Sequence, residues 1–226
     1  PAIVDLGASQ VDIPIDEKDL LEQQQMRKQE ANALWDALEE KMRAMETDTP
    51  ENPISSRGLG WISGVPAYIW HCGCSPTAAG MVLMYWDSHG YPNFPDDHNE
   101  TIEELAVAMG TEWPGNGATW PWEISGGIEE VCVNHGYSNF DADNDCLMTW
   151  GKVKNEVDAS KPFVISMLHG GTGSGQSEPY GEHSVTCLGY SDYDEDYVFI
   201  HDTWDEHTHT IAFGNWWAAM ATWVRP

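Results

Sequence analysis

The stretch His71-Cys72-Gly73-Cys74-Ser75-Pro76-Thr77-Ala78-Ala79-Gly80 (HCGCSPTAAG) places two cysteines one residue apart, directly before a segment suited to begin a helix. Three roles fit such a pair of thiols: ligands of a metal ion, partners in disulfides, or a nucleophile. Cys-x-Cys is a poor zinc motif, because zinc knuckles usually have about two to four residues between the cysteines and a second pair downstream. The disulfide and nucleophile roles both stay open at this point.

A buried helix is predicted immediately after Cys74. Pro76 suits the first turn of a helix, where its missing N–H group is not needed. The run 78–86 is nearly all apolar, and Gly90 is a typical residue for a helix end. A thiol at the start of such a helix faces unpaired backbone N–H groups and the positive end of the helix dipole, which lower its pKa. The pattern therefore favours Cys74 as a nucleophile.

The number of cysteines is odd. Cys72, Cys74, Cys132, Cys146 and Cys187 make five, so complete pairing leaves one thiol over. An unpaired thiol is a candidate reactive group. A disulfide from Cys72 to Cys132 or Cys146 is one hypothesis that leaves Cys74 as a thiol.

A thiolate nucleophile needs a base, and the base needs a group that orients it. His183 opens an alternating segment that ends at Tyr190, and residues 197–200 are predicted to be the returning strand of a hairpin. Asp202 follows that second strand. Because a hairpin places the start of one strand beside the end of the next, we expect His183 and Asp202 to be neighbours. Asp205 is an alternative orienting group.

The rest of the chain changes from helical to strand patterns toward its C-terminus. The glycine-rich segment 170–175 lacks the Lys-Ser/Thr of a phosphate loop, so we expect a flexible loop that borders the cleft. Helices followed by strands indicate an α+β fold. Further helices are predicted at about 101–109, 126–135 and 150–160, and further strands at 163–167, 208–212 and 221–224.

Residues 1–58 are predicted to form an N-terminal arm. Apolar residues recur at helical spacing between 31 and 45, and the segment 48–60 is rich in Pro and Gly, as linkers are. We therefore divide the chain into a helical arm, 1–58, and a second domain, 59–226. The arm packs on the domain, forms a dimer contact, or covers the cleft as a pro-segment; the sequence leaves these roles and the oligomeric state open.

Residues 73–83 (GCSPTAAGMVL) resemble the nucleophile helix of the papain-like cysteine peptidases. The resemblance is closest to the branch of the double-glycine leader peptidases, which process bacteriocins and carry the motif Cys-(Gly/Ser)-Pro-(Thr/Ala). In that branch a His opens a strand of the form His-small-Val-x-x-x-Gly-Tyr, as in residues 183–190 (HSVTCLGY), and an Asp or Asn follows the next strand, as Asp202 does. The resemblance covers about residues 65–204.

The resemblance implies a papain-like α+β fold and a function. A helical lobe would carry Cys74, and an antiparallel sheet would carry His183 and Asp202. The family hydrolyses peptide bonds through a thioester, without a cofactor. For this chain the resemblance therefore implies a Cys74-His183-Asp202 triad and a peptide or protein substrate.

One position departs from the family pattern. The family usually places a Gln about six residues before the cysteine, where it donates a hydrogen bond to the oxyanion, and this chain has Tyr68 there. Tyr68, Trp70 and His71 are the candidate replacements, together with the Cys74 N–H group. The loss of one such donor typically slows catalysis roughly 100- to 1000-fold.

Two functions from different classes therefore stay open. The first is a cysteine peptidase or related amide hydrolase, and acyl transfer to an amine by the same thioester is not separable from it by sequence. The alternative is a non-catalytic extracellular binding or structural module on the same fold, possibly dependent on a cation. The ordered Cys, His and Asp favour the first function, and the missing Gln favours the second.

The charge of the chain limits the classes of partner that it can bind. It has 37 acidic and 10 basic residues, a net charge of −27, which makes nucleic acids and anionic membrane surfaces unfavourable partners. No apolar run reaches about 18 residues, roughly the length of a helical membrane span. Such acidity suits a salty or extracellular medium, so we expect a secreted or otherwise extracytoplasmic protein of bacterial or archaeal origin.

Calcium is a weak alternative within this acidic composition. Residues 141–145 (DADND) resemble the opening of a calcium-binding loop, but Cys146 and Lys152 stand where the loop needs Gly and Glu. We therefore expect an acidic turn here, with no metal site and no required cofactor.

Overall fold

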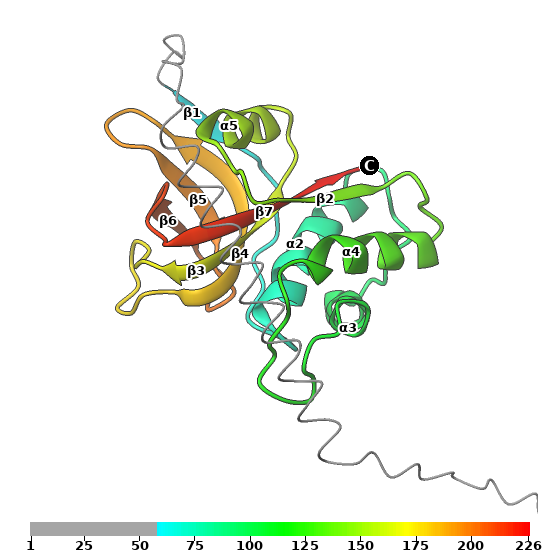
Figure 1. Cartoon of the computed structure of the whole chain (residues 1–226). Helices are drawn as coiled ribbons and strands as arrows, with labels where there is room; N and C mark the ends of the chain where they lie inside the picture. The colour runs from blue at the N-terminus through cyan, green and yellow to red at the C-terminus, as the bar shows by residue number, and fades with distance from the viewer. Residues whose placement is uncertain (1–57) are drawn as a thin grey trace, which may run out of the picture. The chain divides into compact units, whose positions relative to one another are not determined.

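Seven antiparallel strands form a sheet, and a group of helices precedes most of them in the chain (Figure 1). The computed structural model describes residues 58–226. The strand order is β2-β7-β3-β4-β5-β6, and β1 pairs with β4. The strands are β1 (Leu59–Trp61), β2 (Asp141–Asp145), β3 (Phe163–Gly170), β4 (Gly181–Ser191), β5 (Tyr197–His201), β6 (Thr208–Ala212) and β7 (Ala218–Arg225). The helices are α2 (Cys74–Asp87), α3 (His98–Ala108), α4 (Glu123–Asn134) and α5 (Trp150–Asp158).

Helix α2 is the centre of the helical part. Its sequence is apolar on nearly every side, and a helix of this kind is stable only where other elements surround it. It packs against β4 and β3 on one side and against α3 and α4 on the other. Figure 1 shows α2, α3 and α4 together beside the sheet, while α5 lies near β1. The predicted buried helix and the predicted α+β class are confirmed.

The predicted acidic turn at 141–145 is wrong, because these residues form strand β2. The strand pairs antiparallel with β7, from Asp141 opposite Arg225 to Asp145 opposite Ala221. Aspartate is disfavoured in strands, but Asp145 has cationic and indole partners at this edge of the sheet. Asp145 accepts hydrogen bonds from Lys152 Nζ at 2.6 Å and from Trp223 Nε1 at 3.1 Å. Tertiary partners therefore override the local preference.

The hypothesis of a disulfide from Cys72 to Cys132 or Cys146 is also wrong. No disulfide joins Cys72 to either residue. Cys72 packs against Ile102 and Ala106 of α3, whereas Cys132 of α4 lies in the main hydrophobic core. The two thiols serve as small apolar side chains in separate clusters.

The predicted N-terminal arm lies outside the described residues, apart from Gly58. Its helix, its role and its boundary with the second domain stay predictions. Among the described residues, no helix combines the length and apolar character needed to cross a membrane.

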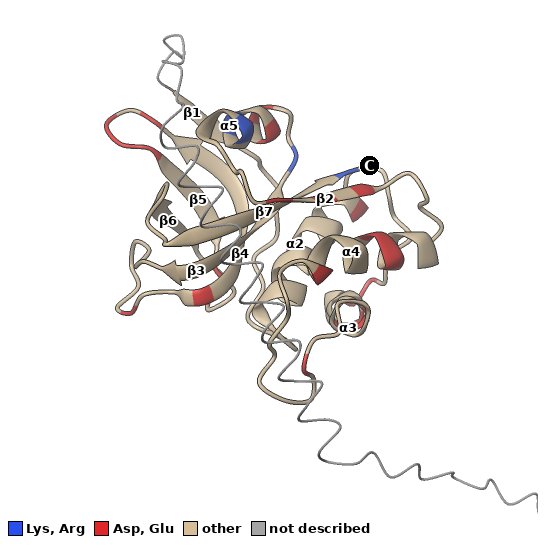
Figure 2. Ribbon diagram, in the orientation of Figure 1, with Lys and Arg blue, Asp and Glu red and all other residues tan. Residues whose placement is uncertain are grey.

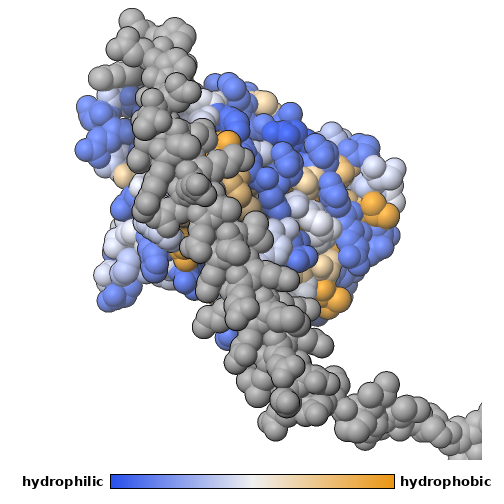
Figure 3. Space-filling model, viewed as in Figure 1, coloured by the Kyte–Doolittle hydropathy of each residue, from blue (hydrophilic) through white to orange (hydrophobic). Residues whose placement is uncertain are grey.

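Acidic side chains spread over α3, α4, β2 and the turn between β4 and β5 (Figure 2). The face seen in Figure 3 is mostly hydrophilic, with apolar residues in small separate patches. The basic residues of the described part are few and lie in or near α5 and at the end of β7. Three of them are paired: Lys152 with Asp145, Lys154 with Asp192, and Arg225 with Glu156.

Replacement of Asp145 by Ala tests the anchoring of β2. Burial raises the pKa of Asp145, but hydrogen bonds from Lys152, the Leu147 N–H and Trp223 outweigh it, so the pKa lies below its usual value. A depressed pKa means that the carboxylate contributes stability above the unfolded pKa of about 3.9, and that this contribution disappears as the pH falls. We expect Asp145→Ala to lower the free energy of unfolding at pH 7 by about 1–3 kcal/mol.

Urea unfolding at pH 7 and about pH 3 measures this difference. The expected loss shrinks at the lower pH, because the contribution of the ionised Asp145 declines once the pH falls below the unfolded pKa of about 3.9 toward the lower folded pKa. Asp143→Ala, at an exposed position of the same strand, is the control and should have little effect. Equal effects of the two variants at pH 7 would contradict the anchoring role.

Candidate active site

Cys74 is the first residue of α2, and its thiol lies among three hydrogen-bond donors. These are the imidazole of His183, the backbone N–H of Ser184 and the hydroxyl of Ser75. Burial raises the pKa of the thiol, but the hydrogen bond and charge of His183, with the two serine donors, lower it further than burial raises it. The net pKa lies below that of an ordinary thiol, so the site favours the thiolate.

The turn before Cys74 has a strained backbone that one threonine holds. Cys72 adopts a φ of 61°, in the left-handed region that non-glycine residues avoid. Thr77 Oγ1 lies 2.7 Å from the carbonyl oxygens of both His71 and Gly73, which share its single hydroxyl proton, and it accepts the His71 N–H at 2.9 Å. The helix thus holds the turn that leads into it, and this turn sets the position of the nucleophile.

Gly73 allows a second segment to approach the nucleophile closely. A Cβ atom at this position would lie 2.6 Å from the carbonyl oxygen of Gly117. Gly117 has a φ of +72°, and a Cβ there would meet the Trp70 ring at 2.6 Å. The loop around Gly117 therefore packs directly on the backbone beside Cys74, and no side chain fits between them.

His183 lies near the start of β4, opposite Met167 of β3. Its Nε2 atom is 2.6 Å from the backbone carbonyl oxygen of Asp202. A carbonyl oxygen only accepts, so Nε2 donates its proton there, and Nδ1 is left for the sulfur of Cys74. Its ring stacks parallel to Tyr180 with centroids 5.6 Å apart and lies 5.1 Å from Trp204.

The protonated form of His183 is favoured despite its burial. Burial lowers the pKa of the imidazole, but the hydrogen bond and charge of Cys74 and the carbonyl and charge of Asp202 raise it above the usual value. The lowered thiol pKa and the raised imidazole pKa belong to one coupled pair. Together they favour a thiolate beside an imidazolium.

The carboxylate of Asp202 points away from His183. It is fully buried, and its Oδ2 accepts hydrogen bonds from Gln176 Nε2 at 2.7 Å and Tyr180 Oη at 2.9 Å. Its Oδ1 accepts the Trp204 N–H at 3.0 Å. The hairpin brings Asp202 beside His183 as its sequence pattern predicts, but the contact is made by the backbone carbonyl. The sequence pattern contains no signal for this difference.

Asp205, the alternative orienting group, lies beside other histidines. Its Oδ1 is 3.0 Å from His209 Nε2 and 3.3 Å from His207 Nδ1. The loop between β3 and β4 reaches the same place, since His209 Nδ1 is 2.6 Å from the Ser174 carbonyl oxygen. With Gln176 on Asp202, this loop borders the site.

Two of the three candidate oxyanion donors have partners elsewhere. The Tyr68 ring stacks on His98, with centroids 3.9 Å apart. Burial and the charge of Asp87 raise the pKa of Tyr68 to about 12, and Asp87 is the last residue of α2, at the end opposite Cys74. His71 Nε2 is 3.0 Å from Glu103 of α3.

Trp70, the third candidate donor, lies beside the loop after β5 that carries Asp202. The backbone N–H of Trp70 donates to the Thr203 carbonyl oxygen at 2.6 Å, and Thr203 Oγ1 is 3.4 Å from His183 Nε2. The Trp70 ring meets Trp113 edge to face, with centroids 6.1 Å apart, and remains 39% exposed. It is therefore the candidate best placed to face a substrate.

Two groups of side chains in the described part have donor atoms close enough to share a cation: His71, Cys72 and Glu103, and Asp202, Asp205 and His209. In each group a histidine is already within hydrogen-bond distance of a carboxylate. We therefore assign no metal ligand among the described residues.

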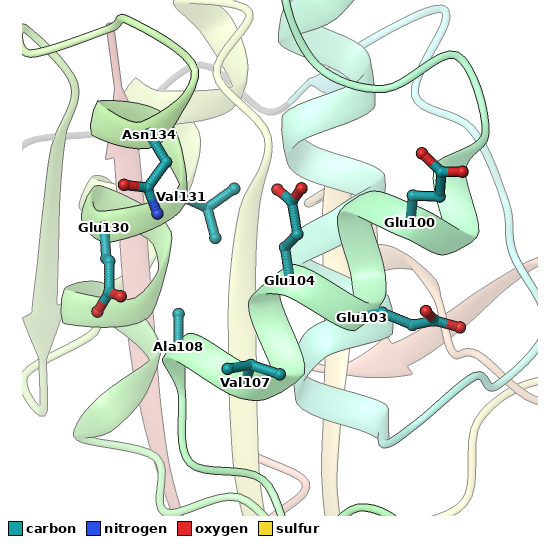
Figure 4. A pocket seen from close by; sticks show the side chains of 8 residues that line it. All are labelled: Glu100, Glu103, Glu104, Val107, Ala108, Glu130, Val131 and Asn134. Carbon is teal, nitrogen blue, oxygen red and sulfur yellow. The ribbon is translucent and has the colours of Figure 1, made fainter. Parts of the chain in front are cut away.

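A groove of about 460 Å³ opens elsewhere, between α3 and α4 (Figure 4). The lining includes none of the groups that contact the Cys74 thiol, and only Glu103 among its residues contacts a candidate site residue, His71, so the groove is not part of the candidate active site. Its lining residues are Glu100, Glu103, Glu104, Val107, Ala108, Glu130, Val131 and Asn134.

Comparisons with known proteins agree with the resemblance drawn from the motifs. A family model described as the Peptidase C39 like family matches residues 62–223, which include Cys74, His183 and Asp202. The fold is similar to the crystal structure of a Bacillus anthracis protein assigned as a C39-like peptidase, with a TM-score of 0.51. The identity is 16%, and the match covers 75% of this chain and 98% of that chain. At this identity the likeness concerns the fold alone. No curated protein matches the chain.

Replacement of Thr77 by Val tests how the turn before Cys74 is held. Valine keeps the size of the side chain but removes the hydroxyl that serves three backbone groups. We expect the free energy of unfolding to fall by about 1–3 kcal/mol. Thr101→Val is the matched control, because the buried Thr101 hydroxyl has only a weak 3.8 Å contact with Met84 Sδ. A loss in Thr101→Val as large as in Thr77→Val would contradict the clamp.

Proposed function

Because the chain belongs to the Peptidase C39 like family, we propose that it is a cysteine peptidase that cleaves peptide bonds through a thioester on Cys74. The observation that carries the proposal is the pairing of the Cys74 thiol with the His183 imidazole at the start of a buried helix. The lowered pKa of the Cys74 thiol and the raised pKa of the His183 imidazole both favour the thiolate form of the nucleophile. Cys74 is the proposed nucleophile and His183 the proposed acid and base.

The acylation step begins with the thiolate. The Cys74 sulfur attacks the carbonyl carbon of the substrate, which forms a C–S bond and moves the carbonyl electrons onto oxygen. His183 Nδ1 then gives its proton to the amide nitrogen, the C–N bond breaks, and the amine leaves. A thioester on Cys74 and a neutral His183 remain.

Hydrolysis of the thioester returns the enzyme to its first state. The neutral His183 takes a proton from a water molecule, whose oxygen attacks the thioester carbon. The C–S bond breaks and its electron pair returns to the Cys74 sulfur. A carboxylic acid leaves, and the thiolate again lies beside the imidazolium.

The negative charge on the substrate oxygen needs hydrogen-bond donors. We assign this role to the backbone N–H of Cys74, at the positive end of α2, and to the indole N–H of Trp70. Tyr68 and His71 are less suited, because His98 and Glu103 engage their side chains.

Asp202 is proposed as a positioning residue. Its backbone carbonyl holds the Nε2 proton of His183, which directs Nδ1 toward the sulfur. Its carboxylate, held by Tyr180 and Gln176, keeps that carbonyl in place and adds a negative charge that favours the imidazolium. Trp204, on the same loop as Asp202, lies against the His183 ring.

The missing glutamine supports one alternative, a binding module on the same fold. In that case the thiol pair would persist without efficient cleavage, because an oxyanion donor is absent. A peptide or protein ligand and an extracytoplasmic location fit either function. Transfer of the acyl group to an amine instead of water is a variant of the first function.

Alkylation of Cys74 tests the activated thiol. With iodoacetamide across about pH 5–9 and peptide mapping, we expect Cys74 to react rapidly near pH 6. Cys132 and Cys187 are internal controls, since burial raises the pKa of each to about 12. His183→Ala removes the positive partner, so its Cys74 should react at least about tenfold more slowly near pH 6.

The same experiment separates the two functions. Rapid, His183-dependent labelling with cleavage of a peptide library, lost in Cys74→Ala, fits the peptidase. Labelling that rises only near the ordinary thiol pKa of about 8.5, and that does not depend on His183, would contradict the peptidase proposal. Rapid labelling without cleavage favours the binding module or acyl transfer.

Replacement of Asp202 by Asn separates its carbonyl from its carboxylate. Asparagine keeps the backbone carbonyl, so we expect a loss of about tenfold in kcat/KM, much less than the roughly 10⁴-fold loss known where a carboxylate contacts the histidine directly. The negative charge raises the pKa of His183, so its removal should move the alkaline limb of the pH profile to lower pH. Asp205→Asn is the matched control. A loss of about 10⁴-fold in Asp202→Asn would assign the role to the carboxylate.

A further inference from the structure

Three buried serine hydroxyls form a continuous chain beside Cys74. Ser75 Oγ lies 2.8 Å from Ser184 Oγ, and Ser184 Oγ lies 2.9 Å from Ser166 Oγ. The three residues come from α2, β4 and β3, and each is 3% exposed. Ser75 also donates its hydroxyl to the Cys74 sulfur. The chain therefore begins in the sheet and ends at the nucleophile.

The chemistry of the groups sets the direction of the chain. A thiolate only accepts hydrogen bonds, so Ser75 must give its single hydroxyl proton to the sulfur. Ser75 then accepts a hydrogen bond from the Ser184 hydroxyl, and Ser184 in turn accepts one from the Ser166 hydroxyl. All three O–H dipoles point toward the negative sulfur, and aligned hydrogen bonds strengthen one another.

We propose that Ser166, Ser184 and Ser75 form a hydroxyl chain that stabilises the anionic form of Cys74, with Ser184 and Ser166 as positioning residues that act through Ser75. This inference rests on the proposed function of Cys74 as a nucleophile. The Ser184 backbone N–H also donates to the sulfur. Ser184 thus serves the nucleophile twice, by its backbone directly and by its side chain through Ser75.

The contribution of the serines to the thiolate can be measured separately from that of the charged groups around the sulfur. His183 of β4 is the charged group that acts on Cys74, and Asp202 acts on His183. The serines are neutral, so their removal changes hydrogen bonding without changing the charge of the site. Replacement of Ser184 by Ala removes the hydroxyl and keeps the backbone N–H that faces the sulfur.

The strand also offers a matched control. Thr186 lies two residues after Ser184 on β4, and its buried hydroxyl donates to the Ala78 carbonyl oxygen of α2 at 2.8 Å. Thr186→Val therefore removes a buried bond between the same two elements without touching the chain of serines. A purely structural effect of hydroxyl loss should appear in this variant too.

The test is the pH dependence of iodoacetamide alkylation of Cys74 in the full chain. Near pH 6 we expect Ser75→Ala to react roughly tenfold more slowly than wild type, because it loses a hydrogen bond to the charged sulfur. Ser184→Ala should slow the reaction about twofold to fourfold and Ser166→Ala less, since both act through neighbours. Thr186→Val should match wild type, and thermal unfolding of each variant checks the fold.

Coupling between the serines decides the proposal. In Ser75→Ala the chain no longer reaches the sulfur, so adding Ser184→Ala should cause no further slowing. Additive slowing in the double variant, or equal rates in Ser184→Ala and wild type, would overturn the chain and leave the activated Cys74–His183 pair intact. A wild-type Cys74 that reacts only as an ordinary thiol would overturn the proposed function and the inference with it.

Discussion

The contact between the first turn of α2 and the start of β4 is the interaction on which the rest of this structure depends. It brings Cys74 to His183, Ser75 to Ser184, and the Ala78 carbonyl to Thr186. The helix is buried on nearly every side, so its position follows from the packing of apolar side chains, and the polar contacts at its N-terminus follow from that position. The core and the candidate site are therefore parts of one packing arrangement.

The polar groups of the site are hydrogen-bonded in a way that leaves them few alternative arrangements. Thr77 serves three backbone groups in the turn before the nucleophile, and the Asp202 carboxylate accepts from three donors on its own loop and the loop before β4. Buried polar groups that are fully paired hold a single arrangement, because any other arrangement leaves a group unpaired. In this arrangement the Asp202 backbone carbonyl holds His183, and the Asp202 carboxylate affects the imidazole through its charge.

The strongly acidic composition has little part in this site. Among the described basic residues, Lys152 and Arg225 pair with Asp145 and Glu156 near the β2 edge of the sheet, and Lys154 pairs with Asp192. The acidic segment that forms β2 has a poor strand preference, but α5 supplies Lys152 to Asp145 and β7 supplies the paired strand. The groove between α3 and α4 shows the same acidity without any of the proposed catalytic groups (Figure 4).

Sequence patterns were enough to predict the helix after Cys74, the hairpin that joins His183 to Asp202, the α+β class and the family, because each depends on local periodicity or on a short motif. Other features follow from tertiary packing alone: strand β2, the separate burial of Cys72 and Cys132, the contact of the Asp202 carbonyl with His183, and the serine chain. The pair Ser166–Ser184 exists because β3 and β4 meet in one register, and a slip of either strand by one residue would place the two serines on opposite faces of the sheet. Such contacts join residues far apart in the chain, and no local pattern encodes their distance or direction.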